Sequence, residues 1–180
     1  MSVLEKTGLR RSRALDIVTN AVFFNISWFV IVVTQSSLIG PAQAALHLLL
    51  HFWLIGRGAP EMRLIAVVLV AGIGLDQLMF ATGVLSSAGA SFAPLWLSCL
   101  WPVFASTLCH AFRSFHDRTV LAALLGAFGG AGSYVAGARL SDVVISSPVV
   151  GTLILAVVWA VLFPLLLKLA ARWVPEHEAH

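Results

Sequence analysis

Apolar residues fall into six blocks along the chain, each close to twenty residues long. A helix rises about 1.5 Å per residue, so about 20 apolar residues span the roughly 30 Å of hydrocarbon in a bilayer. The pattern therefore predicts an all-α, polytopic membrane protein in which residues 1–180 form one bundle of six transmembrane helices. The predicted helices cover residues 16–35, 39–57, 62–84, 92–112, 119–139 and 147–172.

Two kinds of link alternate between these blocks. The links QSSLIGP (35–41) and SSAGAS (86–91) are uncharged, whereas GRGAPEMR (56–63) and RSFHDR (113–118) carry charge. Ten of the eleven Lys and Arg residues lie on the side of the charged links, and Arg139 lies on the other. These ten are Lys6, Arg10, Arg11, Arg13, Arg57, Arg63, Arg113, Arg118, Lys168 and Arg172. Because cytoplasmic loops carry the excess of Lys and Arg, both termini are predicted to be cytoplasmic.

Composition agrees with a protein that is embedded in a membrane. Hydrophobic residues make up 59% of the chain and charged residues 11%, whereas a soluble domain carries about 25% charged residues. The net charge of +3 comes from residues that flank apolar blocks, so it does not indicate a nucleic-acid partner. The sequence contains no P-loop, no dinucleotide-binding glycine motif and no nucleophile elbow, which leaves ATP hydrolysis without a recognisable motif.

Asp76, in the stretch AGIGLDQLMF, is the one acidic residue well inside a predicted helix. An ionisable group inside the membrane is unfavourable unless it faces protein, water or a partner, and it is therefore a candidate site by default. Two interpretations stay open: a hydrogen-bonded acid that ties helices together, or a group that carries a proton, binds substrate or takes part in catalysis. The carboxyl is expected to be protonated, to pair with His47, or to bond to Tyr134 or Asn25.

The stretch ALHLLLHFW places His47 and His51 four residues apart, on one face of a helix. We expect this face to point into the bundle, because imidazole exposed to hydrocarbon would lose its hydrogen bonds. A metal ion would require a third ligand, and His110 and Asp76 are the candidates that the sequence offers. Without an assured third ligand, we expect no metal and no cofactor. The pair either bridges helices or belongs to a site.

Depth along the helices sorts the polar residues into two layers. His110 and Arg113 lie three residues apart near the cytoplasmic edge, where Arg113 either reaches the lipid headgroups or helps to hold a phosphate or carboxylate. Asp76 and His47 are the candidate catalytic residues of a polar centre near the midplane. The candidate substrate-binding residues are Asn25, His51, His110, Arg113 and Tyr134.

Small residues mark the fifth predicted helix, which reads LLGAFGGAGSYVAG. Gly126 with Gly130, and Gly129 with Ser133, form small-xxx-small pairs that let helix backbones approach closely. This helix is predicted to be central and packed on at least two neighbours. The alternative is a glycine face that opens on a ligand.

Five stretches follow one another along the chain: NAVFFNISWF, HLLLHF, GLDQLMFATGVL, PLWLSCLWPVFASTLCHAFR and GAFGGAGSYVAGARL. In this order they resemble a bacterial family of small inner-membrane proteins that contain a domain of unknown function. The likeness covers roughly residues 18–165. The residues that carry its most specific parts are Trp96, Trp101, Phe104, Thr107, His110, Arg113, Gly129, Gly130, Ser133, Tyr134, Gly137, Arg139 and Leu140. The resemblance implies a multi-pass protein of the bacterial inner membrane and no particular reaction.

Three functions are compatible with these features. The first is a protein that binds, and modifies, an inner-leaflet lipid or another hydrophobic small molecule at the intramembrane polar site. The second is a non-catalytic transporter or carrier subunit, since the predicted topology is also similar to that of the substrate-binding subunits of energy-coupling vitamin transporters. The third is a scaffold that seats a membrane-protein partner or a second copy of itself.

The charge asymmetry generates a direct test of orientation. A reporter that is active only in the cytoplasm, fused after the C-terminal residue, should be active, because ten basic residues hold that side of the bundle inside. A fusion at the 86–91 link should be active only with a periplasmic reporter. The opposite pattern at both positions would overturn the predicted topology.

Overall fold

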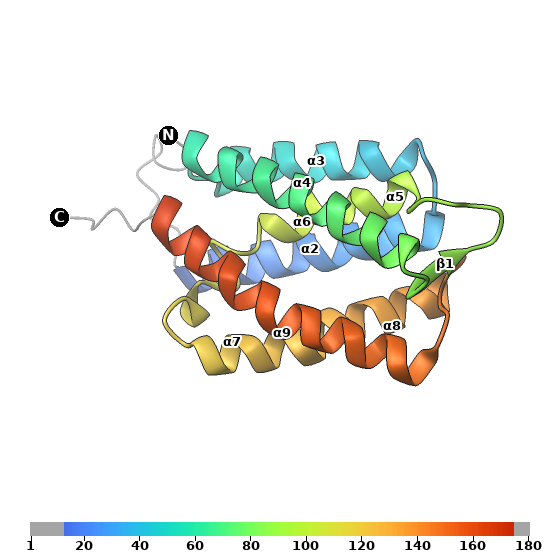
Figure 1. Cartoon of the computed structure of the whole chain (residues 1–180). Coiled ribbons are helices and arrows are strands. Elements are labelled where there is room, and N and C mark those ends of the chain that lie inside the picture. Colours follow the sequence, from blue (N-terminus) through green and yellow to red (C-terminus); the bar gives the residue numbers. More distant parts are fainter. Residues whose placement is uncertain (1–12, 175–180) are drawn as a thin grey trace.

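The computed structural model describes residues 13–174, which form a helical bundle with one short pair of strands (Figure 1). The long helices are α2 (Arg13–Thr34), α3 (Ile39–Leu54), α4 (Ala59–Ala81) and α9 (Pro148–Trp173). The shorter elements are β1 (Leu85–Ser87), α5 (Leu95–Ser98), α6 (Leu100–Ala105), the 3-10 turn η1 (Arg113–Phe115), α7 (Thr119–Leu125), the π-helical turn η2 (Gly126–Gly130), α8 (Ala131–Leu140) and β2 (Val143–Ile145). The predicted all-α class is confirmed.

Within residues 13–174, four helical stretches are long and apolar enough to cross a membrane. They are Ala14–Thr34, Ala59–Ala81, Thr119–Leu140 and Pro148–Trp173, the third of which joins α7, η2 and α8. The predicted second helix is present as α3, which has 16 residues and is about 24 Å long. Six crossings therefore stay a prediction. Lys6, Arg10 and Arg11, which contribute to the predicted orientation, lie outside the described residues.

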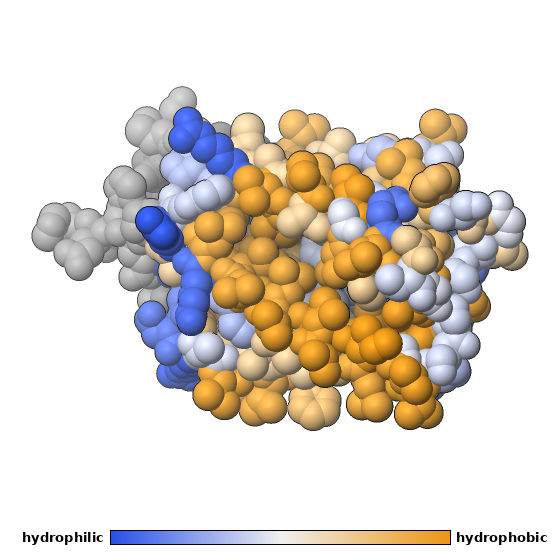
Figure 2. Space-filling model, viewed as in Figure 1, coloured by the Kyte–Doolittle hydropathy of each residue, from blue (hydrophilic) through white to orange (hydrophobic). Residues whose placement is uncertain are grey.

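The helices run roughly parallel to one long axis, and α5 and α6 lie in the middle of the bundle, in contact with α2, α3 and α4 (Figure 1). The α2 helix begins and the α9 helix ends at the same end of the bundle. Apolar residues cover the centre of the α4–α9 face, and hydrophilic residues gather at its two ends (Figure 2). This distribution is the one that a bilayer-spanning bundle requires.

The predicted fourth helix, 92–112, is corrected by the structure. Its helical part is Leu95–Ala105, about 17 Å long, and turns carry the chain from Ser106 to Phe112. Pro102 lacks a backbone N–H, which interrupts the helix between α5 and α6. The Ser106 and Thr107 hydroxyls then donate to the carbonyls of Val103 and Phe104 at 2.7 and 2.6 Å. These bonds compete with helix continuation, and the irregular backbone is tolerated because it is buried in protein.

A two-stranded antiparallel sheet closes the end of the bundle away from the α2 start. β1 pairs with β2 in the register Leu85↔Ile145 to Ser87↔Val143. The Ser87 hydroxyl also donates to the Asp142 carboxylate at 2.9 Å. The pairing joins the link after α4 to the link before α9, so both helices are held together at this end.

The stretch Thr119–Leu140 is the fifth predicted helix and is called helix five below. It packs closely against α9, as the sequence predicts, but it lies along one edge of the bundle and is not central (Figure 1). A Cβ added at Gly126 would overlap the Trp159 backbone, and one added at Gly130 would overlap the Trp159 indole. The other face is different, since a Cβ at Gly129, Gly132 or Gly137 would meet no atom within 4 Å. The two small-residue pairs therefore differ in role: one packs on a helix, and the other opens on a cavity.

Trp101 of α6 and Trp159 of α9 stack at the centre of the molecule. Their ring centroids are 5.6 Å apart and the rings are parallel within 1°. Gly72 of α4 lies against the outer face of Trp101, where an added Cβ would overlap the indole, and Gly130 lies against Trp159. The order Gly72–Trp101–Trp159–Gly130 thus brings α4, α6, α9 and η2 into one packed layer.

This layer predicts a large effect of a single methyl group. Gly72→Ala should lower the stability of the bundle by about 1–3 kcal/mol, the usual cost of overpacking, because the Trp101 ring has no room to move between Gly72 and Trp159. Gly74→Ala on the same helix is the matched control, since its Cβ meets nothing within 4 Å. The measurement is the apparent melting temperature in detergent. Equal melting temperatures for the two variants would contradict the tight packing of this layer.

Candidate functional site

An elongated cavity of about 480 Å³ lies in the bundle. Its walls are α2, the central α5 and α6 helices, the stretch Thr119–Leu140 (helix five) and α9. Along helix five its lining extends from Leu125 to Ser141, a rise of about 24 Å. The large side chains of its wall are apolar or aromatic, and they include Phe24, Trp28, Trp96, Leu100, Phe104 and Phe163. Its volume lies within the range of about 300–1,000 Å³ that is typical of small-molecule sites.

Asp76 contributes a carboxyl group to the wall of this cavity. The residue is 0% exposed. Tyr134 Oη donates to its Oδ1 at 2.5 Å, and Trp101 Nε1 donates to its Oδ2 at 2.7 Å. Of the partners expected from the sequence, Tyr134 is the one that the structure gives. Both donors are neutral, and each carboxylate oxygen keeps a further lone pair that can accept a hydrogen bond.

Other polar atoms lie along the same cavity. Asn25 lines it from α2, and its side-chain amide donates to Ala21 O at 2.8 Å. Trp28 Nε1 donates to Ser133 Oγ at 3.0 Å, which ties α2 to α8 across the cavity. Trp159 also lines the cavity, and its buried Nε1 has no hydrogen-bond partner among the described residues. A buried donor of this kind costs free energy unless a ligand or water supplies an acceptor.

His47 belongs to a separate chain of hydrogen bonds between α2, α3 and the turn after α6. Gln43 Nε2 donates to Ser27 Oγ at 3.1 Å, Ser27 Oγ lies 3.0 Å from His47 Nδ1, and His47 Nε2 lies 2.9 Å from Ser106 Oγ. Because Ser106 donates its proton to Val103 O, its oxygen accepts from His47. The hydrogen bonds then all run in one direction. A neutral His47 accepts a hydrogen bond from Ser27 at Nδ1 and donates one to Ser106 from Nε2.

The expected common centre of Asp76 and His47 is therefore not what the structure has. The two side chains bond to different partners, and His47 is not among the residues that line the Asp76 cavity. The inward orientation of the histidine pair is confirmed, since His47 is 2% and His51 1% exposed. His47 ties α3 to its neighbours.

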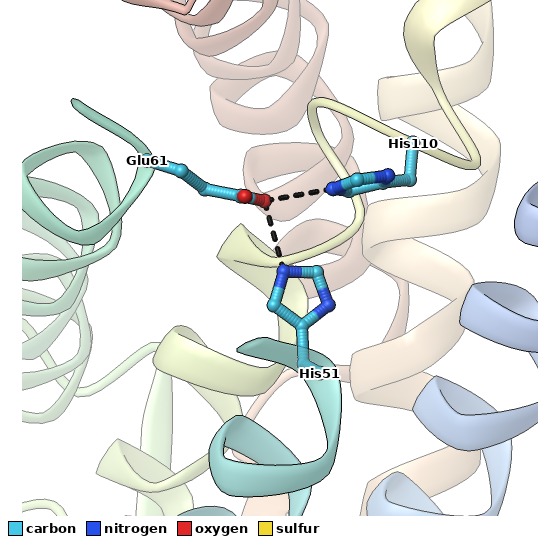
Figure 3. A group of neighbouring side chains, drawn as sticks. All are labelled: His51, Glu61 and His110. Atoms are coloured by element: carbon cyan, nitrogen blue, oxygen red, sulfur yellow. Dashed lines mark hydrogen bonds and ion pairs between the residues drawn. The ribbon is translucent and has the colours of Figure 1, made fainter. Parts of the chain in front are cut away.

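His51, Glu61 and His110 form a second buried group, at the end of the bundle where α3 ends and α4 begins (Figure 3). Glu61 Oε1 accepts from His51 Nε2 at 2.9 Å and from His110 Nε2 at 3.0 Å. The backbone N–H of Arg57 donates to Glu61 Oε2 at 2.6 Å. The three side chains come from α3, α4 and the turns after α6, so the group joins three separate segments.

The remaining predicted residues are distributed between these two groups. Asn25 and Tyr134 lie with Asp76 at the cavity, whereas His51 and His110 lie with Glu61. Arg113 begins η1 and is half-buried. The helical spacing assumed for His110 and Arg113 does not hold, because the α6 helix ends at Ala105. Four of the five predicted substrate-binding residues thus lie with Asp76 or with Glu61, and Arg113 lies on the turn that follows His110.

Two residues of these groups were not predicted from the sequence. Glu61 was assigned to a charged link, but α4 begins at Ala59 and buries Glu61 in its first turn. Trp159 belongs to the almost purely apolar last helix, where no polar pattern distinguishes it. A signal for Glu61 was present: Pro60 at the first turn of a helix is typical of a helix start, which would have placed Glu61 inside the helix.

The comparisons with known proteins identify a family and no activity. No curated protein and no solved structure shows a significant match to the chain. The family model described as a protein of unknown function (DUF2878) matches residues 17–165, which include both buried groups and the whole cavity lining. This agrees with the resemblance to an uncharacterised family that the sequence indicated, and the chain belongs to the DUF2878 family.

Proposed function

We propose that the protein is a polytopic membrane protein that binds a lipid or another hydrophobic small molecule in the cavity beside Asp76. One observation carries the proposal: a long apolar cavity whose wall contains a buried carboxyl group, held by Tyr134 and Trp101. An extended apolar chain suits such a cavity, and a polar group on that chain would meet Asp76. The proposed membrane is the bacterial inner membrane, with six crossings and cytoplasmic termini.

The position of the cavity opening favours entry from the bilayer. Asn25 and Gly129 both line the cavity and are exposed. Both lie near the middle of their helical stretches, Ala14–Thr34 and Thr119–Leu140. An opening at mid-height faces hydrocarbon in a bundle that spans the bilayer, whereas an aqueous route would open at one end. This geometry supports a lipid or lipid-like ligand over a soluble substrate.

The unpartnered Trp159 donor supports a ligand that carries a hydrogen-bond acceptor. The indole N–H is buried beside the cavity and has no acceptor among the described residues. Asp76 lines the same cavity and offers acceptor lone pairs. A ligand with a hydroxyl or carboxyl group suits such a lining, because that group can donate as well as accept. The proposed function is binding. Transport or chemical change of the ligand would be a later step that requires this binding.

The cavity itself can be blocked without touching the packed core. Gly129→Trp should fill its mouth, because an added side chain there meets no atom within 4 Å. We expect at least about a tenfold loss of bound ligand, equivalent to about 1.4 kcal/mol. The measurement is mass spectrometry of molecules that remain with the protein after extraction in polymer nanodiscs and repeated detergent washing.

The matched control for the blocking variant is Leu124→Trp, on the same helical stretch. Leu124 is 50% exposed and is not among the lining residues, so it should retain the ligand. Absence of any hydrophobic molecule from the unaltered protein, or equal retention by the two tryptophan variants, would overturn the proposed function.

The role of Asp76 is separable from its contribution to folding. Asp76→Asn keeps an oxygen that accepts from Trp101, and its amide can donate to the Tyr134 oxygen, so the fold should be retained. If the carboxyl group binds the polar end of the ligand, the same extraction should recover at least about tenfold less ligand. Thermal stability in detergent is measured alongside. A stable Asp76→Asn protein with full ligand retention would show that Asp76 only ties helices together.

A further inference from the structure

His51, Glu61 and His110 have the composition of a metal site that keeps one position open. Two imidazoles and one carboxylate are a ligand set that binds zinc and other divalent transition metals in proteins. One nitrogen or oxygen from each residue lies within 4.8 Å of the other two. The side chains converge on one point from three segments of the chain (Figure 3). The reason for expecting no metal, a missing third ligand, is removed by Glu61.

The distances in this group are close to those that a metal ion imposes. Zinc binds nitrogen and oxygen at about 2.0–2.2 Å, so two ligand atoms on a tetrahedral ion lie about 3.3 Å apart. Here Glu61 Oε1 lies 2.9 Å from His51 Nε2 and 3.0 Å from His110 Nε2. A shift of a few tenths of an ångström at each of these two pairs would bring them to the separation found on a zinc ion. The third pair, formed by the ligand nitrogens of His51 and His110, lies within 4.8 Å.

The surroundings fix the ligands as a metal site requires. His51, Glu61 and His110 are 1%, 0% and 6% exposed, so water competes little for the group. The Arg57 N–H holds the second carboxylate oxygen at 2.6 Å, and a hydrogen bond of this kind orients a ligating carboxylate. The His51 and His110 rings pack edge to face, with centroids 5.0 Å apart. These contacts hold the three donors in place before any ion binds.

We propose that His51 Nε2, His110 Nε2 and the Glu61 carboxylate bind one divalent transition-metal ion of the zinc class. Binding replaces the two hydrogen bonds to Glu61 by metal–ligand bonds, and each imidazole then carries its proton on Nδ1. Three protein ligands leave a fourth position for water, the arrangement found in catalytic zinc sites. The site is distinct from the Asp76 cavity, because none of its three residues lines that cavity.

The test uses the full chain, purified in detergent without a metal-affinity step. Metal content is measured by mass spectrometry before and after chelation, and the chelated protein is titrated with Zn²⁺ and with Co²⁺. We expect about one Zn²⁺ per chain, a higher melting temperature with Zn²⁺, and the visible absorption bands of four-coordinate Co²⁺. X-ray absorption of the zinc-loaded protein should show nitrogen and oxygen neighbours at about 2.0–2.2 Å and no sulfur.

Three variants assign the ion to this group. Glu61→Gln retains an oxygen that can accept from both imidazoles, and His51→Gln and His110→Gln each remove one ligand. Each should weaken Zn²⁺ binding by at least about 100-fold, because loss of a supporting hydrogen bond alone costs about 10–100-fold. The control is His116→Gln. His116 lies outside the group, and its Nε2 contacts Leu108 O at 2.9 Å.

The outcomes separate a metal site from a hydrogen-bonded tie. No Zn²⁺ binding by the unaltered protein, binding that the three variants leave unchanged, or sulfur in the X-ray absorption spectrum would each overturn the proposal. The spectra come from the unaltered chain, so they decide the matter even if a variant fails to fold. A stable Glu61→Gln protein that binds no Zn²⁺, beside His116→Gln that does, would establish it.

Discussion

The stack of Trp101 on Trp159 is the contact on which the rest of the structure depends. It joins the central α6 helix to α9, and Gly72 and Gly130 allow α4 and η2 to approach its two outer faces. Because a glycine contributes no side chain, the backbone itself packs on each indole, and little freedom is left for the rings. Without this layer, α4 and helix five would have no common surface, and the cavity would lose one wall.

The same stack connects packing to the proposed site. Trp101 donates to Asp76 from one side of the stack, and Trp159 lines the cavity with an unpartnered indole N–H. Each indole thus fills the core with a large apolar ring, and the one polar atom of Trp101 holds the carboxyl group of Asp76. The buried carboxyl of Asp76 is held by neutral donors, whereas Glu61 is held by two imidazoles and a backbone N–H. The two acids therefore have different hydrogen-bond partners.

Sequence reasoning succeeded where the signal was local. Apolar blocks predicted the long helices, the spacing of His47 and His51 predicted an inward face, and the small-residue pairs predicted close packing of helix five. Tyr134, one of the partners that the sequence offered for Asp76, does bond to it, and Asn25 lines the same cavity. The sequence wrongly predicted that residues 106–112 continue a helix. The Ser106 and Thr107 hydroxyls, which end the α6 helix, bond to nearby carbonyls, and such bonds leave the hydrophobic pattern unchanged.

By itself, the sequence determined that the chain forms apolar helices suited to a bilayer, since length and hydropathy alone decide which segments can cross hydrocarbon. It also indicated that Asp76, His47 and His51 lie inside apolar helices, but it did not indicate the burial of Glu61. Only the tertiary structure decided which of them meet, separating His47 from Asp76 and bringing Glu61 to His51 and His110. The physical reason is that helix order and rotation are set by packing between distant segments, such as the indole stack, and no periodicity along one helix records which neighbour it will face.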